Sequence, residues 1–184
     1  MALLELGCRA ALVVVFGLAI AGKVRGRASW NAFVQTLEAF GVLSPLPRAP
    51  SAAVIVGLEA AAAASLVAAP ALGYAIALGL LAIFTAALGL ALRRGQRAPC
   101  RCFGASERPI GPAHVARNAA LLAVAIAGLV VRSMTSPSIA GLRDAIAALL
   151  VGGMAGFLIT RWDDLLFLFS AAPAPTERAA PPRR

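Results

Sequence analysis

Two cysteines close together in a polar stretch are the most reactive pair in this chain. Cys100 and Cys102 are separated by Arg101, and Pro99 and Gly104 bracket the pair. Because proline and glycine interrupt regular structure, we expect the two cysteines to lie on a loop. The two sulfurs can reach each other across a one-residue spacer, but the small ring that they close is strained. Strained and exposed disulfides are the reducible kind, so the pattern favours thiol–disulfide exchange.

Positive charge surrounds the two cysteines in the sequence. Three interpretations of the pair are open. Arg97, Arg101 and Arg108 favour the thiolate over the thiol, which promotes exchange. The cysteines could instead form a static staple, or half of a metal site. Zinc usually needs four cysteine, histidine or carboxylate ligands, and only His114 and Glu107 are near in the sequence. We therefore predict no metal site.

Glu59 is the second candidate for a chemical role, because it is an ionisable residue near the middle of an apolar segment. A charged carboxylate facing lipid at that depth costs a few kcal/mol. We expect its side chain to face the interior of a helix bundle, where it is protonated, hydrogen-bonded or paired. The carboxyl group would then have one of two roles. It could act in a function, such as a proton relay or contact with a redox carrier, or it could stabilise helix packing through a hydrogen bond.

A third polar group follows the cysteines, at the start of the next apolar segment. His114, Arg117 and Asn118 have helical spacing and share one face. They could orient or electrostatically activate the thiols, or they could anchor the helix at the membrane interface. Both interpretations fit the pattern equally well.

The composition places these residues in a membrane. Hydrophobic residues make up 60% of the 184 residues and charged residues 14%, and the mean hydropathy is +0.85. Ordinary soluble domains are roughly 45–50% apolar. The length allows four or five spans of about 20 residues, so we expect an integral membrane protein without a separate soluble domain. The net charge of +9 then reflects arginines that flank the membrane, and no nucleic-acid binding is expected.

The chain order predicts an all-α fold with a four-helix transmembrane bundle as its core. An amphipathic helix at residues 29–40 is expected to lie along the interface, because its apolar residues recur at helical spacing. A fifth, C-terminal span is expected beyond the core, followed by an interfacial segment and a disordered tail. The predicted units are a bundle at 1–131, a fifth helix within 132–162, and the tail at 163–184. The predicted spans are residues 3–22, 51–69, 72–92, about 113–131 and 139–159.

The orientation in the membrane has two conflicting indications. With five spans, most arginines fall on the side that carries Cys100 and Cys102. The positive-inside rule then places both cysteines in the cytoplasm. Disulfide exchange, however, is commoner on the oxidising side of the membrane. The sequence leaves both orientations open, as it does a role for Cys8.

Taken together, these elements resemble the MauE family of membrane proteins, which is related in architecture to DoxX. The resemblance runs over about residues 3–131 and is carried by five features. They are Gly22-Lys23 at the end of the first span, Phe40 to Leu43 after the interfacial helix, Glu59, the Cys-x-Cys-Phe-Gly of residues 100–104, and the His-x-x-Arg-Asn of His114, Arg117 and Asn118. The chain departs from the family pattern in its fifth span and in Arg101, where a small spacer would be more usual.

The resemblance implies a redox-associated bundle in a bacterial-type plasma membrane, linked to methylamine utilisation. Members that gave the family its name act in maturation or export of the methylamine dehydrogenase small subunit, alongside a thioredoxin-like partner. By that analogy, Cys100 and Cys102 would be catalytic with Glu59, supported by Arg101, His114, Arg117 and Asn118. Beyond the lipid bilayer, the expected partners are a thioredoxin-like protein and a disulfide-bearing client. No cofactor motif is present in the chain, so any electron carrier would be borrowed, for example a membrane quinone.

Three functional hypotheses result. The first is a membrane thiol–disulfide relay, in which one thiolate attacks a partner disulfide and the other resolves the mixed intermediate. The second is a non-catalytic assembly factor whose loop only docks a partner. The third is a small-molecule permease that uses Glu59, although the chain shows no obvious inverted repeat.

Overall fold

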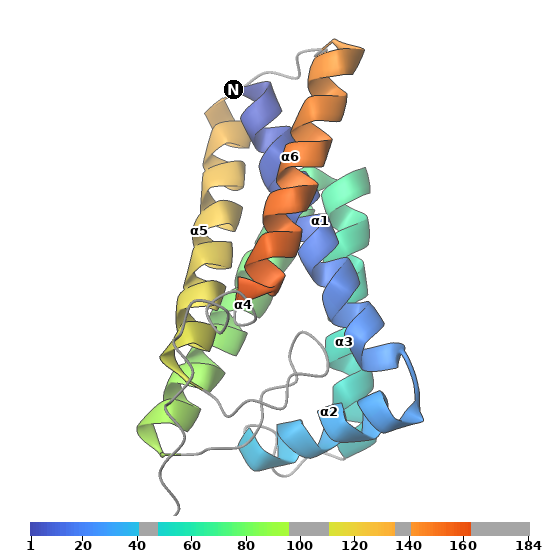
Figure 1. The fold of residues 1–184 in the computed structure, drawn as a ribbon, viewed down its shortest axis with the longest axis vertical. Helices are drawn as coiled ribbons and strands as arrows, with labels where there is room; N and C mark the ends of the chain where they lie inside the picture. The colour runs from blue at the N-terminus through green and yellow to red at the C-terminus, as the bar shows by residue number, and fades with distance from the viewer. Residues whose placement is uncertain (41–47, 96–110, 135–140, 163–184) are drawn as a thin grey trace, which may run out of the picture.

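The computed structural model describes residues 1–40, 48–95, 111–134 and 141–162, and all its regular structure is helical. Five of its helices are long and apolar enough to cross a membrane, which confirms the predicted fold class. The shorter α2 lies across one end of the others (Figure 1). The helices are α1 (Ala2–Val24), α2 (Arg27–Phe40), α3 (Arg48–Ala68), α4 (Pro70–Arg93), α5 (Pro112–Met134) and α6 (Leu142–Thr160).

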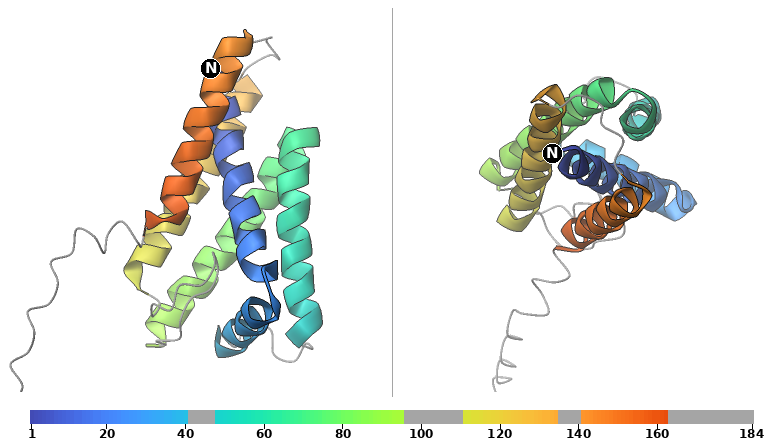
Figure 2. Two further views of the ribbon diagram at one scale, coloured as in Figure 1. Left: turned by 45° about the vertical axis from the view of Figure 1, so that its right-hand side comes forward. Right: turned by 90° about the horizontal axis from the view of Figure 1, so that it is seen from above.

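Helices α1, α3, α4 and α5 form an antiparallel four-helix core, with α1 in contact with α2, α3, α5 and α6 (Figures 1 and 2). Helix α4 closes the core by packing against both α3 and α5. The core is apolar, and large aliphatic side chains such as Leu58, Ile83 and Ile126 also face outward, as they do in helices that are hydrophobic on all sides and span a membrane. The central cluster contains Leu12, Val15, Phe16, Ala62, Leu66, Tyr74, Ala77, Leu80, Leu81, Leu121 and Ala125.

Two helices begin before the spans that the sequence predicts. The span predicted to begin at residue 72 belongs to α4, of which Pro70 is the first residue. Proline suits that position because the first helical N–H has no intrahelical partner. Similarly, α3 begins at Arg48, so Pro50 lies inside its first turn instead of in the preceding loop. The interfacial segment and the tail, as predicted for 163–184, lie outside the described residues.

Helix α6 packs against α1 through small residues. Gly152 and Gly156 are buried and are separated by one turn of α6. A Cβ atom added to Gly156 would lie 2.5 Å from the carbonyl oxygen of Ala11, and one added to Gly152 would overlap the backbone of Gly7. The two backbones therefore approach as closely as they do in small-xxx-small membrane interfaces. Close backbone contact at these glycines, together with Ile159 near the end of α6, holds the fifth span against the core.

Candidate functional site

A buried ion pair joins the end of α1 to the middle of α3. The Nζ atom of Lys23 donates a hydrogen bond to Oε1 of Glu59 at 2.5 Å. The side chains are 1% and 2% exposed, so both charges are withdrawn from water and from lipid. Removing one member of such a pair strands the other charge, at a cost of about 3–5 kcal/mol. Glu59 therefore faces the bundle interior, and of the three states expected for it, the structure has the paired one.

Aromatic rings from two other helices surround the lysine. The Nζ atom lies 5.0 Å from the ring centroid of Phe33 on α2 and 5.9 Å from that of Phe84 on α4. At these distances the negative faces of the rings attract the ammonium group. Phe33 is 2% exposed and contacts Trp30 edge-on. Its side chain ties the amphipathic helix α2 to the ion pair, so four helices meet around one cation.

The carboxylate of Glu59 keeps hydrogen-bonding capacity beyond the lysine. Its Oε2 atom is buried and has no hydrogen-bond partner among the described residues. A buried acceptor without a donor costs free energy, and such atoms are rare in folded proteins. The oxygen is therefore suited to accept a proton or a hydrogen bond from a reacting group.

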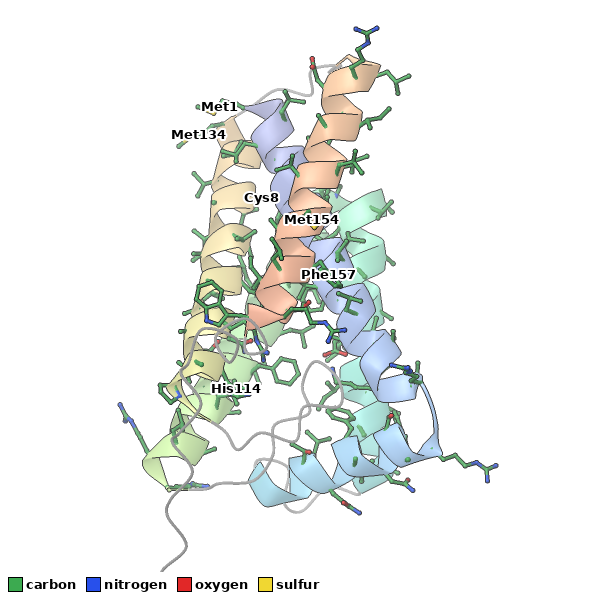
Figure 3. All side chains as sticks on the ribbon, viewed as in Figure 1. Met1, Cys8, His114, Met134, Met154 and Phe157 are labelled. Atoms are coloured by element: carbon green, nitrogen blue, oxygen red, sulfur yellow. The ribbon has the colours of Figure 1, made fainter. Side chains whose placement is uncertain are left out.

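The inward face of α5 presents the three polar residues that the sequence placed on one face. His114, Arg117 and Asn118 are 4%, 5% and 1% exposed. The N–H of Gly111 donates to Nδ1 of His114 at 3.4 Å. His114 lies in the first turn of α5, toward the end of the bundle that α2 crosses (Figure 3). Their side chains are therefore covered by protein, and whether they act on the thiols or anchor the helix at the interface stays a prediction.

Cys100, Arg101 and Cys102 lie outside the described residues, but the helices on both sides of them are described. Helix α4 ends and α5 begins at the end of the bundle that α2 crosses (Figure 1). Cys100 is five residues beyond Gly95, a span of at most roughly 18 Å even for an extended chain. Cys8, a half-buried free thiol in the first turns of α1, lies toward the opposite end (Figure 3).

Lys23 is a residue of this site to which the sequence analysis assigned no chemical role. The sequence analysis named it only in the Gly22-Lys23 feature at the end of the first span. The sequence does contain a feature that could have identified this residue. Lys23 is the only lysine among 17 lysine and arginine residues. Elsewhere the chain uses arginine for its cations, including those that flank the membrane. The exception marks a position that needs a compact ammonium group instead of a planar guanidinium.

Comparison with known families supports the architecture. The family model described as methylamine utilisation protein MauE matches residues 1–131. The chain belongs to the MauE family. The match covers α1 to α5 and ends within α5, so α6 lies beyond it. No curated protein and no solved structure matched the chain in the other two comparisons.

Five charged or polar residues from the features that carried the resemblance are buried in the structure. Lys23, Glu59, His114, Arg117 and Asn118 are the charged and polar members of the motifs that carried the resemblance, and all five are buried. They come from α1, α3 and α5. The chain is thus a multi-pass membrane protein of a family described by methylamine utilisation.

Proposed function

We propose that this MauE-family protein supports thiol–disulfide exchange in the maturation of a partner protein. In the reaction, one thiolate of the Cys100 and Cys102 pair attacks a partner sulfur and displaces the partner's other sulfur as a thiolate. The second cysteine then attacks the mixed disulfide. The partner leaves as a dithiol, and the chain keeps the disulfide and has given up two electrons. The reverse sequence oxidises the partner.

The observation that supports this proposal is the gathering of buried ionisable groups where the cysteine segment joins the bundle. Lys23 and Glu59 pair inside that half of the core. Arg117 lies one turn after His114 on the inward face of α5, the helix that follows the segment. Fixed positive charge near a cysteine favours its thiolate, and the thiolate is the attacking species.

Glu59 is proposed to handle the protons of the reaction. Oxidation of a dithiol to a disulfide releases two protons with its two electrons. The second oxygen of Glu59 can accept a proton, while Lys23 keeps the side chain oriented. When the reverse sequence has oxidised the partner and left Cys100 and Cys102 as a dithiol, a membrane quinone is the proposed acceptor that restores their disulfide, since reduction to the quinol takes up two electrons and two protons.

The proposed partners follow the family analogy. They are a thioredoxin-like protein and a disulfide-bearing client, in a bacterial-type plasma membrane. In members linked to methylamine utilisation, the client is the methylamine dehydrogenase small subunit. Other partner proteins could take part in the same exchange, because the reaction requires only an accessible disulfide or dithiol.

Thiol trapping in cells tests the proposal. We expect wild-type protein to shift between an alkylated dithiol and a protected disulfide when cells are treated with reductant or oxidant. Cys100→Ser or Cys102→Ser should block client maturation, and one of the two should accumulate a mixed disulfide with the partner. Cys8→Ser is the matched control and should behave as wild type, because Cys8 lies toward the other end of the bundle.

The same variants distinguish the competing functions. If both cysteine variants mature the client normally, the exchange reaction is excluded and a non-catalytic assembly factor remains. If Glu59→Gln abolishes function while the cysteine variants do not, a permease that uses Glu59 is favoured. Protein levels and monodispersity of each variant are measured in parallel, so that loss of folding is separated from loss of chemistry.

A further inference from the structure

Four exposed arginines form a basic rim at the α2 end of the bundle. Arg25 and Arg27 flank the junction of α1 and α2, and Arg93 and Arg94 end α4. Among the described residues, none of the four makes an ion pair with a carboxylate. The only acidic side chain described in this half of the bundle is Glu59, which is buried against Lys23. Among the side chains that the structure describes, the four rim arginines therefore have no carboxylate partner; the side chain of Glu38 on α2 lies outside them.

The opposite end of the bundle has a different charge pattern. There, Nε of Arg9 lies 3.9 Å from Oε1 of Glu5, and Arg143 is followed directly by Asp144 in the first turn of α6. Acidic groups thus accompany two cations at that end. The contrast shows that the rim does not simply repeat a charge pattern present at both membrane faces.

The rim arginines lie where the membrane-spanning helices α1 and α4 end, which is where lipid headgroups are expected. Helix α2 lies across the bundle end (Figure 1), with Phe33 turned inward and Arg27, Asn31 and Gln35 exposed. An amphipathic helix of this kind lies in the interfacial region, where its polar face meets the headgroups. At the end of α4, the backbone N–H of Arg94 donates to the carbonyl oxygen of Leu90, so the last turn is capped by backbone.

We propose that the basic rim binds the phosphate groups of anionic phospholipids. Guanidinium groups form bidentate hydrogen bonds with phosphate, and they are less strongly hydrated than an ammonium group. A basic residue near an anionic membrane surface strengthens binding by about fivefold. Bound headgroups would hold α2 against the bilayer and fix the depth of the bundle end that carries the ion pair. The inference does not depend on the proposed thiol chemistry.

The test measures which lipids stay with the full-length protein. Wild-type protein is reconstituted into nanodiscs that contain equal amounts of phosphatidylglycerol and phosphatidylcholine, extracted gently, and its retained lipids are quantified. In the rim variant all four rim arginines are replaced by glutamine. We expect it to lose phosphatidylglycerol enrichment by at least about tenfold. A second variant with lysine at the same four positions keeps the charge and should retain most of the enrichment.

A control variant, Arg132→Gln with Arg143→Gln, removes charge at the opposite end and should retain wild-type enrichment. The proposal is overturned if the rim variant keeps its phosphatidylglycerol, or if the control variant loses as much as the rim variant. Raising the salt concentration should weaken retention by the wild type, since exposed charges are screened. Monodisperse elution of every variant verifies folding. Cys100→Ser should not change lipid retention, which separates this inference from the proposed function.

Discussion

The buried pair of Lys23 and Glu59 makes a quantitative prediction about stability. Lys23→Met removes the cation and leaves a carboxylate buried at 2% exposure. Breaking a buried pair in this way costs about 3–5 kcal/mol. For a chain of this size, each kcal/mol shifts the unfolding midpoint by about 2–4 °C, so the variant should unfold roughly 6–20 °C below wild type.

The reciprocal change should cost less. In Glu59→Met, Lys23 keeps its contacts with Phe33 and Phe84, which are worth about 0.5–2 kcal/mol when desolvated. Lys23 also lies in the last turn of α1, so its long side chain can extend toward the headgroups. Glu59, in the middle of α3, has no comparable route. We expect Glu59→Met to cost about 1–2 kcal/mol less than Lys23→Met.

The double variant is the decisive measurement. Replacing both charges by methionine removes the pair without stranding a charge, and such replacements are often neutral or stabilising. We expect the double variant within about 2 kcal/mol of wild type, although each single change is costly. The assay is thermal loss of monodisperse protein in detergent at a fixed heating rate. Arg25→Met, an exposed neighbour, is the control and should change stability by no more than about 0.5 kcal/mol.

The reasoning is refuted if the two single changes simply add. In that case the double variant would be less stable than either single variant, and the two side chains would not depend on each other. A coupling of about 3 kcal/mol or more, with the double variant rescued, supports the pair.

Three further predictions concern packing, accessibility and orientation. Gly156→Ala should destabilise the protein by about 1–3 kcal/mol in thermal unfolding, because the new Cβ atom meets the α1 backbone. Gly153→Ala is the control and should be near neutral, because its new Cβ atom makes only an ordinary contact of 3.6 Å. Lys23 is the only lysine, so mass spectrometry with an amine-reactive reagent should find its side chain labelled at least about tenfold more slowly in folded than in unfolded protein, and equal rates would contradict its burial. The orientation is tested with single cysteines in a variant without native cysteines and a thiol reagent that does not cross the membrane. The positive-inside rule predicts that the reagent labels Gly141→Cys in intact cells and Gly26→Cys only after lysis. The reverse pattern would place the cysteine segment outside the cytoplasm.

Much of the architecture could be predicted because it depends on local properties of the chain. The spans follow from runs of apolar residues long enough to cross a bilayer, and α2 follows from the helical recurrence of Trp30, Phe33 and Leu37. The shared face of His114, Arg117 and Asn118 follows from helical geometry alone. The errors were local as well: the predicted spans began after Pro50 and Pro70, although proline is tolerated in the first turn of a helix.

The sequence by itself determined that this is a multi-pass helical membrane protein of the MauE pattern, with a buried carboxylate on its third helix. Only the tertiary structure decided which cation meets that carboxylate, because Lys23 lies 36 residues away from Glu59 along the chain. It also decided that α6 sits on α1, where glycines permit backbone contact that hydrophobicity cannot specify. Local sequence patterns determine which segments become helices. The way those helices pack, and which of their faces meet, brings charges together that are distant along the chain.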